Sequence, residues 1–193
     1  MWGRRTTGWL VFGLMVGLTL GCDRTVPHDP DALRPVVECL APDARDQDSV
    51  TVWVHPTDPS RSTLIASDKV SDRLFVYDLT GRVLQTVATP KPGNVDVRRG
   101  FPLDGERIDF LAFNQREGRF GIRVYRIDPD TRRIERVDRG DASGQGEGGT
   151  LYHSRASDRF YYVMTSNVGV VTQYELSDDG SVRVAARPVR RWM

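Results

Sequence analysis

The run Val76–Leu79, with the sequence VYDL, recurs twice further along the chain as Val124–Ile127 (VYRI) and Gln173–Leu176 (QYEL). The tyrosines of the three runs are 48 and 49 residues apart. Each run follows an apolar segment and precedes a turn and a less apolar segment, which is the pattern of several short strands. A repeat of about 40–50 residues with four strands is typical of a blade of a β-propeller. The sequence therefore predicts consecutive four-stranded sheets.

Short strands separated by turn residues also account for the rest of this region. The turns contain Thr80-Gly81, Pro129-Asp130 and Asp179-Gly180, residue types that favour reversal of the chain. No stretch shows sustained helical periodicity, so we predict an all-β chain. A β-sandwich with evenly spaced hairpins is the alternative, and the constant period favours the propeller. The expected strands are 50–55, 63–67, 73–79, 83–87, 108–113, 121–127, 134–137, 159–165, 168–176 and 182–186.

The stretch 93–113 is the most informative segment outside the repeat. Val95 and Val97 alternate with polar residues, and turn residues follow between Gly100 and Gly105. An apolar run then extends from residue 108 to residue 113. This order predicts a strand, a turn and a buried strand.

Polar side chains are concentrated at the start of that stretch. Asn94, Asp96, Arg98 and Arg99 place oxygen acceptors and guanidinium groups close together. This combination suits a site for a metal ion and phosphate groups. A solvated strand end with local ion pairs is the alternative, because many surface charges only interact with water. The residues alone leave both interpretations open.

The segment from Gly93 to Asn114, GNVDVRRGFPLDGERIDFLAFN, resembles the corresponding part of the β-propeller phytases. That family carries Asn-Asn-Val-Asp, an arginine and Phe-Pro-Leu-Asn-Gly in the same order. The resemblance extends from about Asp48 to about Trp192. It implies a partial propeller with about three four-stranded blades of the family's six, and a calcium-dependent phosphomonoesterase that acts on phytate. Other similar segments are 53–59, 64–66, 69, 74–79, 151–154 and 173–176.

A partial propeller has unpaired sheet edges. A propeller protects its edges by closing into a ring, and three blades cannot close one. We therefore expect an exposed edge near Val182–Arg191, which the remaining blades or a partner chain would complete. The chain by itself is expected to be incomplete or inactive as an enzyme. The alternative is a non-catalytic propeller module that provides a binding surface or accompanies a full phytase.

The resemblance also implies which residues bind phosphate and calcium, and it assigns no catalytic residue. Lys69, Arg98 and Arg116 fall at or beside phosphate-binding positions of the family. A solvent-exposed loop lysine is the alternative for Lys69, and a local ion pair with Asp96 or Asp109 is the alternative for Arg98. The implied Ca²⁺ ligands are the side chains of Asp48, Ser49 and Glu147 and the main-chain carbonyl groups of Val50 and Val95.

Several positions depart from the family's pattern. Gln115 stands where an arginine is usual, and Asn167 stands where a phosphate-binding lysine is usual. Ser49 replaces an aspartate and Glu147 replaces a tyrosine, so the expected calcium ligands differ in charge from those of the family. The implied substrate is still phytate or another phosphomonoester.

The N-terminus has the pattern of a targeting segment. Arg4 and Arg5 precede an apolar core over residues 9–20, which is short for a membrane span. The core leads into a Gly-Cys pair that resembles a bacterial lipobox. We therefore predict a lipoprotein-type signal peptide over residues 1–22 and a lipid anchor at Cys22, with an ordinary cleaved signal as the alternative. The expected location is the cell envelope, at the periplasmic face of a membrane, or outside the cell.

The segment after the signal has the composition of a linker. Residues 23–47 contain four prolines among many charges, so they are predicted to form a tether ahead of a folded domain at 48–193. The formal net charge of the whole chain is +1, and the charges are scattered. This pattern does not indicate a nucleic-acid partner, and we expect none.

Overall fold

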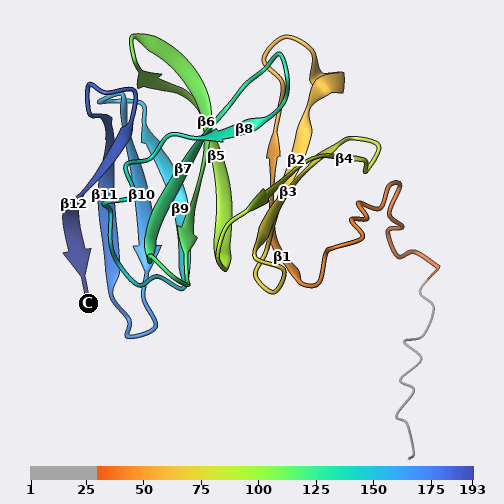
Figure 1. Ribbon diagram of the computed structural model, residues 1–193, viewed down its shortest axis with the longest axis horizontal. Coiled ribbons are helices and arrows are strands. Elements are labelled where there is room, and N and C mark those ends of the chain that lie inside the picture. Colours follow the sequence, from red (N-terminus) through yellow and green to blue (C-terminus); the bar gives the residue numbers. More distant parts are fainter. Residues whose placement is uncertain (1–29) are drawn as a thin grey trace, which may run out of the picture. The chain divides into compact units, whose positions relative to one another are not determined.

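The computed structural model describes residues 30–193, and residues 35–193 form one compact unit. This unit consists of three antiparallel sheets, each built from four strands that are consecutive in sequence (Figure 1). The first sheet contains β1 (Gln47–Trp53), β2 (Thr63–Asp68), β3 (Arg73–Asp78) and β4 (Val83–Ala88). The second contains β5 (Pro92–Leu103), β6 (Glu106–Gln115), β7 (Gly121–Ile127) and β8 (Ile134–Arg136). The third contains β9 (Gly148–Ser154), β10 (Arg159–Thr165), β11 (Val171–Asp178) and β12 (Val184–Trp192).

The predicted all-β fold with consecutive four-stranded sheets is confirmed. Helical structure in the described part is limited to the 3₁₀ turn η1 (Pro59–Arg61). The tyrosines of the three runs lie in β3, β7 and β11, which are the third strands of their sheets. Their neighbours β2, β6 and β10 contain the preceding apolar runs. One period of 48 or 49 residues therefore corresponds to one sheet, as consecutive blades of a partial propeller require.

The turn predicted between Gly100 and Gly105 is shorter than expected. β5 continues through Gly100 and Pro102, and the pairing of β5 with β6 shifts register between Arg98 and Phe101. Gly100 has a φ of 72° at this irregularity, a conformation that glycine adopts without strain. The chain then reverses at Asp104-Gly105, where both φ values are positive. A β-bulge therefore occupies part of the predicted turn.

β9 was not among the predicted strands. It begins at Gly148 and Gly149, and glycine in a strand interior normally weakens the strand. At Gly149 a Cβ atom would clash with the ring of Tyr162, so the missing side chain makes room for that tyrosine. Tyr162 lies in β10, so the space that its ring occupies cannot be inferred from residues 148–154 alone.

Apolar side chains join the first sheet to the second. Trp53, Leu74 and Val76 pack in one buried cluster with Leu111 and Phe113. The indole nitrogen of Trp53 also donates a hydrogen bond of 2.8 Å to a carboxylate oxygen of the second sheet, on Asp109.

A separate apolar cluster joins the second sheet to the third. Phe101, Phe110 and Phe160 form its aromatic centre, with ring centroids 5.0–5.7 Å apart. Such separations and the tilted or edge-on geometries are favourable for aromatic pairs. The second sheet is therefore buried on both faces, and its two neighbours cover it.

Part of the segment ahead of β1 packs on the first sheet. Cys39, Ala41 and Ala44 contact the apolar cluster that contains Phe75 and Tyr77. The compact unit begins at residue 35, so packed chain overlaps the predicted tether at 23–47 and precedes the predicted boundary at 48.

The predicted signal peptide at residues 1–22, including Cys22, lies outside the described residues. Within residues 30–193, no helix is both long enough and apolar enough to cross a membrane.

The last strand lies at a sheet edge. β12 pairs with β11 along its length, and within residues 30–193 its only other strand pairing is a bridge between Asp138 and Val184. Most of its residues are exposed. This position agrees with the exposed edge expected near residues 182–191.

Candidate phosphate- and metal-binding site

Four of the residues singled out from the sequence lie at strand ends on one side of the sheets. Asp48 is at the start of β1 and Lys69 follows the end of β2. Arg116 follows the end of β6, and Glu147 precedes the start of β9. In antiparallel sheets of consecutive strands, the starts of the first strands and the ends of the second strands share one edge. The fold therefore brings together residues that are up to 99 positions apart.

Two carboxylates, one at the start of β1 and one directly ahead of it, hold Lys69. Its Nζ atom lies 3.0 Å from Oδ1 of Asp48 and 3.3 Å from Oδ2 of Asp46. These contacts, chiefly the hydrogen bond with Asp48, raise the pKa of Lys69 above its ordinary value. The lysine therefore stays protonated through neutral pH, in the form that attracts phosphate.

Arg116 connects the first sheet to the third. Its Nη2 atom lies 3.8 Å from Oδ2 of Asp48, and its Nη1 atom donates a hydrogen bond of 3.2 Å to Oε2 of Glu147. The Arg116 side chain is only 17% exposed, and its Nε atom is buried with no hydrogen-bond partner. A buried donor without a partner is unfavourable, so this N–H is available to a ligand oxygen.

These residues form a continuous chain of opposite charges across three sheets. We call the set Asp46, Asp48, Lys69, Arg116 and Glu147 the ionic cluster. Each positive group is held by carboxylates, and each of these contacts crosses a loop or a sheet boundary. The two cations suit phosphoryl oxygens, while the carboxylates suit a metal ion.

Main-chain groups beside the cluster are also brought together. The backbone N–H of Val95 donates a hydrogen bond of 3.2 Å to Oγ of Ser49, which ties β5 to β1. β1 pairs only with β2 and β5 only with β6, so some carbonyl groups on both strands point away from their own sheets. The main-chain carbonyl groups of Val50 and Val95, which the resemblance implies as calcium ligands, belong to these two strands. The Val50 side chain itself is 63% exposed.

Arg98 is held apart from the ionic cluster. Its Nη1 atom lies 2.6 Å from Oδ1 of Asp96, and its Nη2 atom donates to the carbonyl oxygen of Leu151. Asp96 also accepts hydrogen bonds from Oγ1 of Thr150 and the N–H of Leu151. Arg98 pairs with Phe110, about 16 Å along β6 from Gln115 at the strand rise of about 3.3 Å per residue. The local ion pair with Asp96 is therefore the arrangement that the structure shows.

Two residues that support the cluster were missed in the sequence. Asp68 is fully buried and accepts four backbone N–H groups, from Arg45, Asp46, Val70 and Ser71. Burial alone would raise its pKa, but these hydrogen bonds outweigh burial and lower the pKa to about 2. Asp68 therefore fixes the backbone on both sides of Lys69 and beside Asp46. An aspartate two residues before Val70 in a polar turn is the signal that could have identified it.

Asn114 is the second missed residue. It is fully buried, and its Nδ2 atom donates a hydrogen bond of 2.6 Å to the carbonyl oxygen of Gly146. Gly146 directly precedes Glu147, while Arg116 follows Asn114 by two residues. Asn114 therefore sets the separation between the two charged partners.

The described residues supply only part of a calcium shell. Ca²⁺ takes about six to eight oxygen ligands. Within residues 30–193, no group of three or more His, Cys, Asp or Glu side chains is arranged to hold a metal ion. Asp48 and Glu147 have suitable carboxylates, but Arg116 contacts both. These residues are chemically suited to calcium and do not complete its coordination.

The consecutive four-stranded sheets, with charged residues gathered at one end, define a protein of the β-propeller class. Residues 31–193 match the family model described as Phytase. Over 151 residues, the chain is 37% identical to a 3-phytase of Bacillus subtilis (strain 168). The aligned region covers 75% of this chain and 39% of that relative. The chain belongs to the phytase family. It spans about two fifths of the length of this relative.

Proposed function

We propose that this chain provides the phosphate-binding part of a calcium-dependent phytate phosphatase. The observation that carries this proposal is the ionic cluster, in which Lys69 and Arg116 meet two carboxylates from different sheets. Its occurrence in a chain of the phytase family supports a phosphomonoester as the ligand.

The two cations have separate roles in this proposal. Hydrolysis of a phosphate monoester requires neutralisation of the phosphoryl oxygens and correct placement of the attacking water. Lys69 provides a compact positive charge on the first sheet. Arg116 provides a planar donor set, including the unpaired Nε–H, on the second. Together they bind and orient one phosphate group.

The carboxylates of the cluster engage its two cations until ligands arrive. Asp48 and Glu147 pair with the cations in the free chain. When phosphate takes over the cations, these two carboxylates are released and become available to calcium. Bound calcium would supply further positive charge against the phosphates of phytate. We propose that further blades or a partner chain contribute the remaining calcium ligands.

Export belongs to the same proposal. A lipid anchor at Cys22 would place the compact unit at the surface of a membrane, where extracellular or periplasmic phytate is accessible. Incorporation of labelled fatty acid into the expressed chain tests this point. Labelling that persists in Cys22→Ser would contradict the anchor.

Release of inorganic phosphate from phytate, measured with added calcium and with a calcium chelator, tests the activity. Calcium-dependent release that is lost in Lys69→Gln is the expected result. Calcium-dependent phytate binding without release would favour the non-catalytic module. Absence of both binding and release would contradict the proposal.

A further inference from the structure

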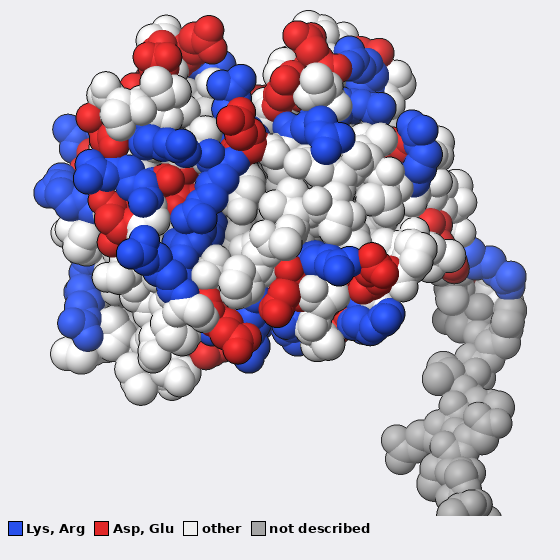
Figure 2. All heavy atoms as spheres, viewed as in Figure 1, with Lys and Arg blue, Asp and Glu red and all other residues white. Residues whose placement is uncertain are grey.

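A second group of arginines, which shares no residue with the ionic cluster, lies on the second and third sheets and their connections. Figure 2 shows basic side chains gathered, with acidic ones among them, over the third sheet and the connection that leads into it. A groove of about 800 Å³ opens there, and both of its walls belong to this chain. We call it the rim groove. Its lining residues are Arg119, Arg136, Asp138, Arg139, Asp179, Ser181 and Arg183.

Asp138 fixes the guanidinium group of Arg136. The side chain of Asp138 is 4% exposed and accepts two hydrogen bonds from Arg136, of 2.9 and 2.8 Å. It also accepts the backbone N–H of Val124 at 3.1 Å. A bidentate pair of this kind fixes geometry as well as charge, so Arg136 is held in place before any ligand binds.

Arg139 is fixed in a similar way on the opposite wall. It lies 3.1 Å from Asp141 and 3.3 Å from Asp179. The pKa of Asp179 is lowered, chiefly by the hydroxyl of Ser181 and also by Arg139. Each of these carboxylates already has an arginine partner.

Arg119 and Arg183 have no carboxylate partner among the described residues. Arg183 donates a hydrogen bond of 3.0 Å to the carbonyl oxygen of Arg136. Arg119 and Arg136 approach the same region, because a Cβ atom added to Gly140 would lie 3.7 Å from Nη1 of Arg119 and 3.0 Å from Nη2 of Arg136, with Oδ1 of Asp138 also 3.7 Å away. Asp138 balances one of these two positive charges, so a bound anion would balance the other.

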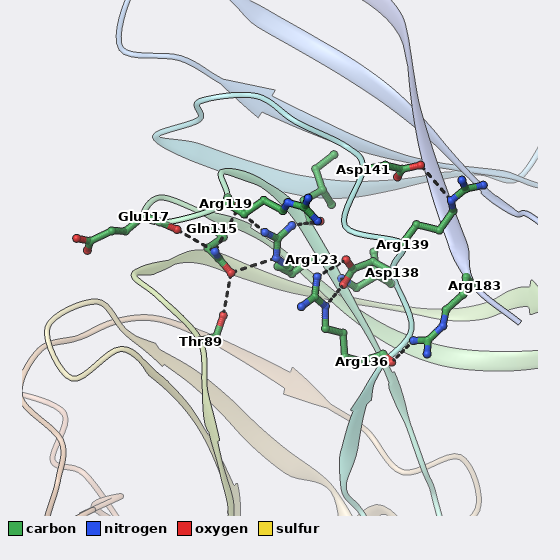
Figure 3. Close-up of polar contacts among 12 residues, drawn as sticks. Thr89, Gln115, Glu117, Arg119, Arg123, Arg136, Asp138, Arg139, Asp141 and Arg183 are labelled. Carbon is green, nitrogen blue, oxygen red and sulfur yellow. Dashed lines mark hydrogen bonds and ion pairs between the residues drawn. The ribbon is translucent and has the colours of Figure 1, made fainter.

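A fifth arginine lies beneath the groove. Arg123 is 2% exposed and forms no ion pair with a described carboxylate. It donates to Oε1 of Gln115 at 3.0 Å and to the carbonyl oxygens of Ile122 and Arg119 (Figure 3). Burial lowers the pKa of Arg123.

The charges of the groove do not balance. Five arginines (119, 123, 136, 139 and 183) face three aspartates (138, 141 and 179), a formal excess of two positive charges. Figure 3 shows these arginines grouped around Asp138 and the segment that carries it. The guanidinium group matches the oxygens of phosphate in shape and hydrogen-bonding pattern. We propose that the rim groove binds a soluble phosphate, either inorganic phosphate or a phosphate ester, as a second anion site.

This site is independent of the proposed phosphatase activity. It shares no residue with the ionic cluster, and all its walls are present in this chain. The rim groove would therefore bind phosphate even if the chain released none from phytate.

Calorimetric titration of the full chain with inorganic phosphate and with phytate tests the site. Arg119→Gln/Arg183→Gln removes the two guanidinium groups without a carboxylate partner. Arg155→Gln/Arg190→Gln is the matched control, because it removes the same charge from exposed positions outside the groove. We expect phosphate binding at one site to weaken at least about tenfold in the first variant, the size of a lost charge-assisted hydrogen bond, and to change little in the control. Unchanged binding in the first variant, or an equal loss in both, would overturn the proposal.

A measurement on the unmodified chain tests the site even if a variant fails to fold. NMR spectra of the unmodified chain should show shifts of the Nε–H signals of Arg119 and Arg183 and of the Gly140 amide on addition of phosphate. Spectra without these shifts would contradict the site. Binding to vesicles containing phosphatidic acid, without any response to soluble phosphate, would also overturn it and assign the groove to a lipid headgroup.

Discussion

Oδ2 of Asp48 lies 3.8 Å from Nη2 of Arg116, so a carboxylate at the start of β1 meets a guanidinium group at the end of β6. The same carboxylate contacts Lys69 through its other oxygen. In the proposed function, Asp48 would therefore compete with phosphate for both cations and would also offer oxygen ligands to calcium. Because of this double role, substitution of Asp48 is expected to have opposite effects on phosphate binding without calcium and with calcium.

Asp48→Asn removes the competing charge and keeps the shape of the side chain. Without calcium, we expect inorganic phosphate to bind about two- to fivefold more tightly, the range expected from an exposed ion pair. With calcium, binding should weaken, because a ligand carboxylate is lost. Titration of phosphate with calcium and with a chelator measures both effects, with Asp130→Asn as the control at an exposed turn. A change in the same direction in both conditions would contradict the double role.

Arg98 is predicted to contribute to the stability of the fold, whereas Lys69 is predicted to contribute to phosphate binding. Arg98→Gln should lower the free energy of unfolding by about 1–3 kcal/mol, because it breaks charge-assisted hydrogen bonds to Asp96 and Leu151. Phosphate binding should remain within about twofold, since the side chain is outside the ionic cluster. Denaturant unfolding and phosphate titration separate the two properties. A large loss of phosphate binding in a stable Arg98→Gln variant would return Arg98 to the phosphate-binding set.

Asp68 is predicted to make stability depend on pH. Its pKa in the folded chain is about 2, below its ordinary value of 3.8, so its contribution is complete above about pH 4 and is lost as the pH falls towards 2. The size of the shift corresponds to about 2 kcal/mol. Asp68→Asn should lower the free energy of unfolding by about that amount at pH 7, and the difference from the unmodified chain should shrink between pH 4 and 2. Unfolding curves that show a pH-independent difference would contradict this assignment.

Phe160 should be a major contributor to the contact between the second and third sheets. It is buried against Phe101 and Phe110, and Phe160→Ala should cost about 3–5 kcal/mol of unfolding free energy. Phe120→Ala, at a partly exposed loop position, should cost much less. Chemical denaturation of both variants tests this difference. Equal small losses would show that the aromatic cluster does not stabilise the sheet contact.

The sequence predicted the sheets because a repeated unit produces a repeated local pattern. The tyrosine runs of β3, β7 and β11 retain the same alternation and the same spacing, so one correct blade predicted the others. β9 was missed because its glycines accommodate Tyr162, a contact between strands. The extent of β5 was missed because a bulge at Gly100 uses the same residue types as a turn.

The candidate site was only partly predictable for a similar reason. Lys69, Arg116, Asp48 and Glu147 were identified because the resemblance supplied their positions, and the strand ends bring them together. Asp68 and Asn114 act through hydrogen bonds to backbone groups, which leave no charge pattern in the sequence. Whether Arg98 pairs with Asp96 or with phosphate depends on how β5 and β9 align.

Lys69 and Arg116 are proposed to form one phosphate-binding site across two sheets. Calorimetric titration of the full chain with phytate in the presence of calcium tests it most directly, using Lys69→Gln/Arg116→Gln and the charge-matched control Arg155→Gln/Arg190→Gln. We predict that the first variant loses about a hundredfold in affinity at one site, as removal of two charge-assisted contacts would produce, and that the control does not. Equal affinity in the unmodified chain and the Lys69→Gln/Arg116→Gln variant would contradict the account.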